Sequence, residues 1–286
     1  MSMRTDLAQE ALEYVKSKDG IAKSTHFYDN CNMEVTEIEI LSENTAQQIG
    51  KPIGKYITLE NKQGCFSFYS QLFNEQAELL QNELLKLLKD KSNILVVGLG
   101  NRAITPDRLG PACAEKIFAT RHIKRLATDI DTSDLSDVCV ISPGVMAQTG
   151  MEASEIVRST AGFVKPQAII AVDALACSDL SHLGTTIQIT NTGISPGSGV
   201  QNSRKELSEK TLGIPCVAVG VPTVADMNTV AEALEAQNCP DNLKTMLVTP
   251  KSIDNLVART AALISTAINR AFHPTLSDEE ITSLIL

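Results

Sequence analysis

The sequence has no tryptophan, and aromatic residues make up only 4% of its 286 residues, whereas hydrophobic residues make up 43%. It has no run of 18 or more apolar residues, so we expect no membrane-spanning helix. Residues 1–6 lack the apolar core of a signal peptide. The formal net charge is −9, which argues against direct binding to nucleic acid or to an anionic membrane. These absences favour a cytoplasmic protein.

Patterns that bind metals are also missing. The seven cysteines are scattered and include no Cys-x-x-Cys pair, so we expect reduced cysteines that serve in packing. The four histidines have no spacing typical of metal ligands, and His182 is predicted to be a surface loop residue. We therefore expect neither a metal ion nor another cofactor.

Apolar runs and helical stretches alternate over most of the chain, which predicts an α/β fold with a mostly parallel sheet covered by helices on both faces. The expected strands are residues 93–97, 138–141, 168–172, 185–189, 215–219 and 245–248. The expected helices are residues 5–18, 73–89, 106–120, 150–163, 203–210, 223–236 and 251–272. Near the N-terminus, residues 34–71 predict a small antiparallel β unit, with strands at 35–41, 53–59 and 65–69.

The chain is organised around residues 92–110. A short apolar strand is followed by Gly98 and Gly100, which allow a sharp turn. Thr105 is a good helix N-cap and Pro106 suits the first helical position. Asp107 should then lie in the first turn of a helix, at the sheet edge where α/β proteins bind ligands.

The predicted partner of Asp107 is Asp173, which ends the apolar run 168–173. An Asx turn or a helix cap would explain this aspartate equally well. If both strands end at one sheet edge, however, the two carboxyl groups meet and share one proton. One of them can then take a proton from water while the other donates a proton. This arrangement predicts peptide hydrolysis without a covalent intermediate.

Three glycine-rich loops follow predicted strands at the same edge, namely residues 142–150, 191–199 and 220–223. Each could be an ordinary turn, but together they could let backbone N–H groups approach a substrate. The candidate substrate-positioning residues are Asn101, Gly144, Gln148, Glu152, Gly193 and Gly197.

Two other motifs suggest different chemistry. Gly98-x-Gly100-x-x-Ala103 fits a dinucleotide fingerprint, but Asp107 at the helix start would repel a pyrophosphate. A nucleotide-binding α/β protein therefore stays an alternative. Residues 193–197 fit a serine nucleophile elbow, but Pro196 has no N–H for the oxyanion hole, which argues against a serine hydrolase.

Several long motifs resemble the spore germination protease family, and the match runs from about residue 3 to beyond residue 270. The motifs are Gly98-Leu-Gly-Asn101, Thr105-Pro-Asp107, Pro143-Gly-Val-Met-Ala-Gln-Thr-Gly-Met-Glu152, Val172-Asp-Ala-Leu-Ala176 and Thr192-Gly-Ile-Ser-Pro-Gly-Ser-Gly199. The resemblance implies an aspartic-type endopeptidase whose essential aspartates are Asp107 and Asp173. It also implies a homotetramer and a fold similar to hydrogenase-maturation peptidases. Because those peptidases hold nickel, a metal-dependent maturation-type peptidase is a further alternative.

The resemblance also implies a zymogen that removes its own propeptide. Family cleavage sites resemble an acidic residue, a large apolar residue and alanine, a pattern that Asp6-Leu7-Ala8 fits. We therefore expect a propeptide of residues 1–6, cleavage between Asp6 and Leu7, and a single peptidase domain of residues 7–286. Without the resemblance, Asp6 would be taken as a helix cap. The implied substrates are small acid-soluble, DNA-binding spore proteins in the spore core.

Overall fold

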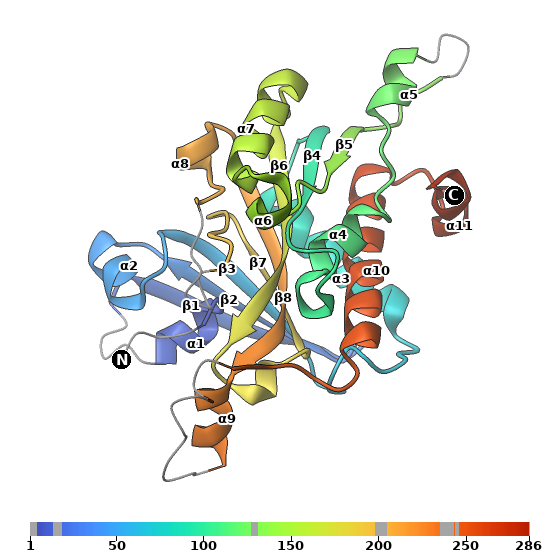
Figure 1. Cartoon of the computed structure of the whole chain (residues 1–286). Helices are drawn as coiled ribbons and strands as arrows, with labels where there is room; N and C mark the ends of the chain where they lie inside the picture. Colours follow the sequence, from blue (N-terminus) through green and yellow to red (C-terminus); the bar gives the residue numbers. More distant parts are fainter. Residues whose placement is uncertain are drawn as a thin grey trace.

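The computed structural model describes residues 5–13, 19–126, 131–197, 205–234, 243 and 246–285. These residues form one mixed sheet with helices on both faces (Figure 1). The predicted helix over residues 5–18 is described only in part, because residues 14–18 lie outside the described residues. Residues 1–4 of the expected propeptide also lie outside them.

The described residues build a nine-stranded sheet in the order β1-β2-β3-β7-β8-β6-β4-β5, with β9 paired to β8. The strands are β1 (Ile21–Tyr28), β2 (Met33–Ile40), β3 (Gly54–Asn61), β4 (Asn93–Gly98), β5 (Asp137–Ile141), β6 (Ala168–Cys177), β7 (Thr186–Thr190), β8 (Cys216–Asp226) and β9 (Leu247–Val248). The neighbours β5, β4, β6 and β8 pair in parallel, and the remaining pairs are antiparallel. The predicted α/β class is confirmed, with the parallel strands in its core.

Helices cover the two faces of the sheet in different groups (Figure 1). One face packs against α3 (Phe73–Leu87), α4 (Leu109–Ala114) and α10 (Ile253–Phe272). The other face packs against α7 (Ala153–Val164), α1 (Ala8–Glu13) and α2 (Glu43–Ile49). The remaining helices are α5 (Arg121–Leu126), α6 (Met146–Thr149), α8 (Glu209–Leu212), α9 (Met227–Ala233) and α11 (Asp278–Ile285), with 3-10 turns η1 (Thr105–Asp107) and η2 (Leu180–His182).

Strand β6 shows why these apolar runs form central strands. Ile170 and Val172 lie in the core beneath α3, α4 and α10, whereas Ile169 and Ala171 lie in the core beneath α7. Successive side chains of a strand point to opposite faces, so a strand covered on both sides must be apolar at every position. Helix α7 and the α1–α2 pair cover separate parts of one face, and residues of β6, β7 and β8 on the sheet line two cavities.

The antiparallel strands near the N-terminus continue the main sheet, because β3 pairs with β7 from Tyr56↔Thr190 to Glu60↔Thr186. The structure has no strand over residues 65–69, which form turns. It adds β1, an edge strand whose side chains are mostly exposed. An exposed edge strand needs no apolar alternation, so the sequence carried no such signal for β1.

Among the described residues, no helix combines the length and the apolar character that crossing a membrane requires.

Candidate active site

A tight turn after β4 positions Asp107. Gly100 has φ +114°, and a Cβ atom there would lie 2.0 Å from the Asp107 carbonyl oxygen, so only glycine fits. The Asn101 N–H donates to the Asp107 carbonyl oxygen at 3.0 Å and to its carboxylate Oδ2 at 2.9 Å. The Thr223 hydroxyl donates to the Pro106 carbonyl oxygen at 2.8 Å. These contacts hold the Asp107 carboxyl group in place.

The local structure around Asp107 differs from the prediction. Residues Thr105–Asp107 form the 3-10 turn η1, whose N-cap is Ile104, and α4 begins only at Leu109. Pro106 occupies the start of η1 rather than of a long helix. Asp107 therefore ends a short 3-10 turn in the connection between β4 and α4.

Asp173 lies within a strand, although the sequence analysis expected it at a strand end. Strand β6 continues to Cys177, whereas its neighbour β4 ends at Gly98, which pairs with Val172. Asp173 is thus the first residue of β6 beyond the end of β4. It is 4% exposed, and one carboxylate oxygen accepts a hydrogen bond from the Ala174 N–H at 2.9 Å.

Asp107 and Asp173 line one cavity of about 380 Å³. Its walls come from the turn after β4, the loops after β5 and β7, and the second half of β8. Most lining side chains are apolar, among them Leu99, Val145 and Leu247. The two aspartates thus lie in the wall of one cavity that is lined mainly by apolar side chains.

The predicted substrate-positioning residues occupy different places. Gly144 and Gly197 line the cavity, although the loop of Gly197 passes at residue 198 outside the described residues. Gln148 Nε2 donates to Asn101 Oδ1 at 2.9 Å, which links the loop after β5 to the turn that carries Asp107.

Two predicted residues lie elsewhere. Gly193 lines a neighbouring cavity of about 510 Å³. Only glycine fits at this position, because a Cβ atom would lie 2.1 Å from the Leu207 carbonyl oxygen. Glu152 is the N-cap of α7, where it forms a capping box with Glu155, and it is not among the described residues that line either cavity. Its position indicates a role in starting α7.

The predicted cleavage site lies against β6. The Asp6 N–H donates to the Ala176 carbonyl oxygen at 2.9 Å, and the Ala176 N–H donates to the Asp6 carboxylate at 2.9 Å. Asp6 lines the cavity that Asp107 and Asp173 line. Leu7 is fully buried and packs with Leu175, Cys177 and Ala225. The structure thus places Asp6 on the wall of the cavity that the aspartates line, and Leu7 in the core beside β6.

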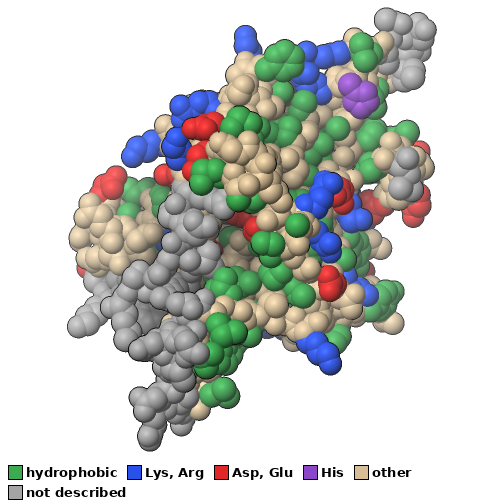
Figure 2. All heavy atoms as spheres, in the orientation of Figure 1, with side chains coloured by type: hydrophobic (Ala, Val, Ile, Leu, Met, Phe, Trp, Pro, Cys, Tyr) green, Lys and Arg blue, Asp and Glu red, His purple; other side chains and the backbone are tan. Residues whose placement is uncertain are grey.

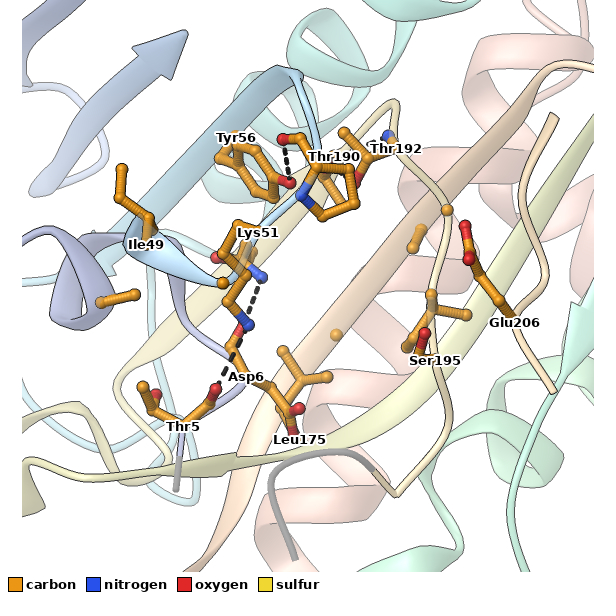
Figure 3. Close-up of a pocket in the computed structure, with 18 of the residues that line it drawn as sticks. Thr5, Asp6, Ile49, Lys51, Tyr56, Leu175, Thr190, Thr192, Ser195 and Glu206 are labelled. Atoms are coloured by element: carbon orange, nitrogen blue, oxygen red, sulfur yellow. Dashed lines mark hydrogen bonds between the residues drawn. The ribbon is translucent and has the colours of Figure 1, made fainter. Parts of the chain in front are cut away.

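Sequence reasoning missed two side chains that contact this segment. Lys51 Nζ donates to the carbonyl oxygens of Thr5 at 3.2 Å and Asp6 at 2.9 Å (Figure 3). Gln188 Nε2 donates to the Asp6 carbonyl oxygen at 3.1 Å. Burial lowers the pKa of Lys51, while the nearby Asp6 and Glu10 act in the opposite direction. Of these two residues, only Gln188 stands out in the sequence, because it is a polar residue at the centre of a strand that is buried on both faces.

His182 is buried rather than a surface residue, which corrects the prediction. It is 7% exposed, and its Nδ1 lies 2.7 Å from Glu10 Oε1. The other Glu10 oxygen accepts hydrogen bonds from the Ser178 N–H and hydroxyl, both at 2.7 Å, and from the Thr5 hydroxyl. This cluster attaches α1 to the 178–182 loop, which begins where β6 ends.

The alternatives find little support in the geometry. Among the described residues, no three His, Cys, Asp or Glu side chains are grouped so that they could hold a metal ion. In the dinucleotide-like turn, the Asn101 N–H already donates to Asp107, so it is not free for a phosphate.

On the face that Figure 2 shows, the Lys and Arg side chains of the described residues lie in small separate groups. Acidic side chains lie between some of these groups. The described residues on this face therefore present no continuous basic surface of the kind that binds nucleic acid.

Comparison with known proteins gives a consistent result. The family model described as Peptidase_A25: Germination protease matches residues 2–235. The germination protease of Clostridium tetani is 40% identical, with 100% of both chains covered. That of Caldanaerobacter subterraneus is 38% identical over 100% of this chain and 98% of the relative. That of Bacillus velezensis is 42% identical over 80% of this chain and 65% of the relative.

Among solved structures, a NiFe hydrogenase maturation protease, HycI from Thermococcus kodakarensis, matches with a TM-score of 0.39 and 19% identity. That match covers 65% of this chain and 98% of the other. The family model and the full-length relatives show that this chain belongs to the germination protease family.

Proposed function

We propose that this germination protease is an aspartic-type endopeptidase in which Asp107 and Asp173 share one proton and activate a water molecule. The observation that carries the proposal is that both aspartates line one mainly apolar cavity, at the end of β4. Two carboxyl groups that share a proton offer a base and an acid at the same time.

In the proposed reaction, the ionised carboxylate removes a proton from water as the water oxygen attacks the carbonyl carbon of the substrate. The carbonyl oxygen becomes negatively charged in the tetrahedral intermediate, and the pair then holds two protons. Collapse of the tetrahedral intermediate breaks the C–N bond, and the amine nitrogen leaves with a proton returned by the pair. The aspartates thus end with one shared proton, as they began, and the pair rather than either residue is the acid and the base.

We further propose that the chain is a zymogen that cleaves itself between Asp6 and Leu7. Support comes from the position of Asp6 on the wall of the same cavity and from the complete burial of Leu7. The same cavity would then accept small acid-soluble proteins in the spore core, and the enzyme would assemble as a homotetramer. Light scattering of the purified chain tests the assembly, since a mass of one or two chains would contradict it.

Intact mass after incubation at mildly acidic pH tests the catalytic pair. We expect the wild type to lose residues 1–6, and we expect Asp107→Asn and Asp173→Asn to slow the loss by at least about a hundredfold. Each substitution keeps the shape of the side chain but removes one exchangeable proton site from the pair.

Asp254→Asn is the matched control, because Asp254 is exposed and its ion pair with Arg108 is long, at 3.8 Å. This variant should process like the wild type. Equal trimming of all four proteins would reject the aspartate pair. If the wild type stays intact, the Asp6–Leu7 site is wrong, and cleavage of an added peptide then tests the pair.

A further inference from the structure

The carbonyl oxygen of Asp6 accepts hydrogen bonds from two side chains that have no role in the reaction proposed above. Lys51 Nζ lies 2.9 Å away and Gln188 Nε2 lies 3.1 Å away. In Figure 3 the Lys51 side chain extends towards the carbonyl groups of Thr5 and Asp6. This carbonyl belongs to the peptide bond between Asp6 and Leu7, for which we propose cleavage.

Gln188 contacts the segment on both sides of that bond. Its Nε2 donates to the Asp6 carbonyl oxygen, and its Oε1 accepts a hydrogen bond from the Ala8 N–H at 2.7 Å. One amide side chain therefore fixes the position of two successive peptide groups. Such a contact recognises backbone rather than side chains, so it suits a protein that cuts several different chains.

The sheet places Gln188 in the same row as Asp173. Asp173 pairs with Gly220 on β8, and Gly220 pairs with Gln188 on β7. Residues paired across a sheet point to the same face, so both side chains rise from the face on which residues 5–8 lie. Two strand spacings separate their backbones by about 10 Å. Leu175 covers the intervening Gly220 and lines both cavities.

The end of α2 fixes Lys51. Gly50 is the C-cap in the left-handed conformation, and the N–H groups of Gly50 and Lys51 both donate to the Ala46 carbonyl oxygen. These bonds set the direction in which the chain leaves the helix. Lys51 thus starts from a fixed backbone position at the rim of a groove, formed by the two neighbouring cavities that Asp6 and Leu175 both line. Its long side chain spans the distance to the segment.

We propose that Lys51 and Gln188 bind the carbonyl oxygen of the peptide bond that is cleaved and stabilise the negative charge that forms there during attack. This inference rests on the proposed function, because it assumes cleavage after Asp6. A carbonyl oxygen gains charge in the tetrahedral intermediate, and positioned donors stabilise it more than the ground state. Lys51 supplies a charged donor and Gln188 a neutral one, both already within hydrogen-bond distance.

Self-processing of the full chain, followed by intact mass, tests this role. Lys51→Met keeps the length of the side chain but removes the donor, so we expect processing to slow by about a hundredfold or more. Lys51→Arg restores a charged donor, so it should process at least about tenfold faster than Lys51→Met. Lys55→Met is the matched control, because Lys55 is exposed and its ion pair with Glu39 is long, at 3.9 Å, and it should process like the wild type.

Gln188→Glu provides a second variant. It keeps the acceptor for the Ala8 N–H but loses the donor to the Asp6 carbonyl oxygen, so processing should slow by at least about tenfold. The melting temperature of every variant is measured. If Lys51→Met does not fold, the processing rate of Gln188→Glu decides whether the inference holds. Recovery in Lys51→Arg separates binding of the carbonyl from a general effect on folding.

Normal or faster processing by Lys51→Met and Gln188→Glu would overturn the inference. Faster processing would show that the two residues merely restrain the segment. Asp107→Asn, run in parallel, separates this failure from failure of the proposed function. If Asp107→Asn is blocked while Lys51→Met is not, only the carbonyl-binding role is wrong, whereas normal processing by Asp107→Asn would reject the aspartate pair as well.

Discussion

The ion pair between Glu10 and His182 links the N-terminal helix to the loop after β6, and both side chains are almost completely buried. Burial raises the pKa of Glu10, but hydrogen bonds from His182, Thr5 and Ser178 outweigh this and lower it overall. Burial lowers the pKa of His182, but the hydrogen bond and the charge of Glu10 outweigh this and raise it. Asp179 and Glu60 add to the negative charge that faces His182.

The two shifts give opposite pH limits to the stability that the pair provides. The Glu10 contribution is present above the unfolded pKa of 4.5 and is lost as pH falls through the lower, folded value. The His182 contribution is complete below 6.5 and is lost as pH rises through the higher, folded value. We therefore expect the pair to stabilise α1 most between pH 4.5 and 6.5.

Chemical denaturation of His182→Ala at several pH values measures this contribution. The variant leaves the Glu10 carboxylate buried without its partner, so we expect a loss of about 3 kcal/mol near pH 6 and a smaller loss near pH 9. Lys205→Met removes an exposed ion pair to Glu155 and should cost less than about 1 kcal/mol at either pH. A loss in His182→Ala that does not change with pH would contradict the ionic character of the contact.

Helix α4 approaches the sheet unusually closely, and two glycines permit this. A Cβ atom at Gly110 would lie 2.2 Å from the Leu99 carbonyl oxygen and 2.4 Å from that of Val172. A Cβ atom at Gly98 would lie 2.2 Å from the Gly110 carbonyl oxygen. All of these neighbours are backbone atoms, which cannot move aside without shifting a strand. The close packing of α4 on β4 and β6 therefore helps to set the position of the turn that carries Asp107.

Alanine at two helical glycines should have opposite effects. Gly110→Ala should destabilise the protein by at least about 2 kcal/mol and reduce proteolysis, because α4 must move away from β4. Gly162→Ala, in the exposed part of α7 with nothing within 4 Å of the added methyl group, should stabilise by about 0.5–1 kcal/mol. Thermal unfolding measures both, and equal effects of the two substitutions would show that the packing of α4 does not matter.

The central elements could be predicted from the sequence because their own residues specify them. Strands β4 and β6 are apolar at nearly every position, since both faces are covered, and α10 carries a clear amphipathic pattern. The aspartates at the sheet edge followed from the same reasoning. The extension of β6 past Asp173 could not be predicted, because it depends on pairing with β8, whose residues lie far away in the sequence.

Lys51, Glu10 and His182 could not have been found in this way, whereas Gln188 is a polar residue at the centre of a buried strand. Lys51 follows a short helix that the sequence analysis did not predict, and it meets Asp6 only because α1 and α2 pack against one face of the sheet. Glu10 and His182 lie 172 positions apart. Their roles come from tertiary packing, and a single sequence contains no local periodicity that reports such contacts.

Over the whole molecule, two kinds of sheet meet at the groove. Strands β5, β4, β6 and β8 are parallel, and Asp173 lies on β6 just beyond the end of β4. Strand β7 runs antiparallel to β8 and is followed across the sheet by the antiparallel strands β3, β2 and β1. Residues 5–8 cross this junction, held by β6 on one side and by Gln188 of β7 on the other. The N-terminal segment therefore joins the two parts of the sheet where the cavities lie.

Because residues 5–8 already occupy the groove of their own chain, the first cut should follow first-order kinetics. No encounter between molecules is needed, so dilution should not slow the appearance of the shortened chain. We expect the half-time of processing, followed by intact mass, to stay constant over a hundredfold range of protein concentration. The inactive Asp107→Asn variant, mixed with active wild type, should stay uncut for many half-times. The rate at which each molecule is processed would then not depend on how many other copies surround it.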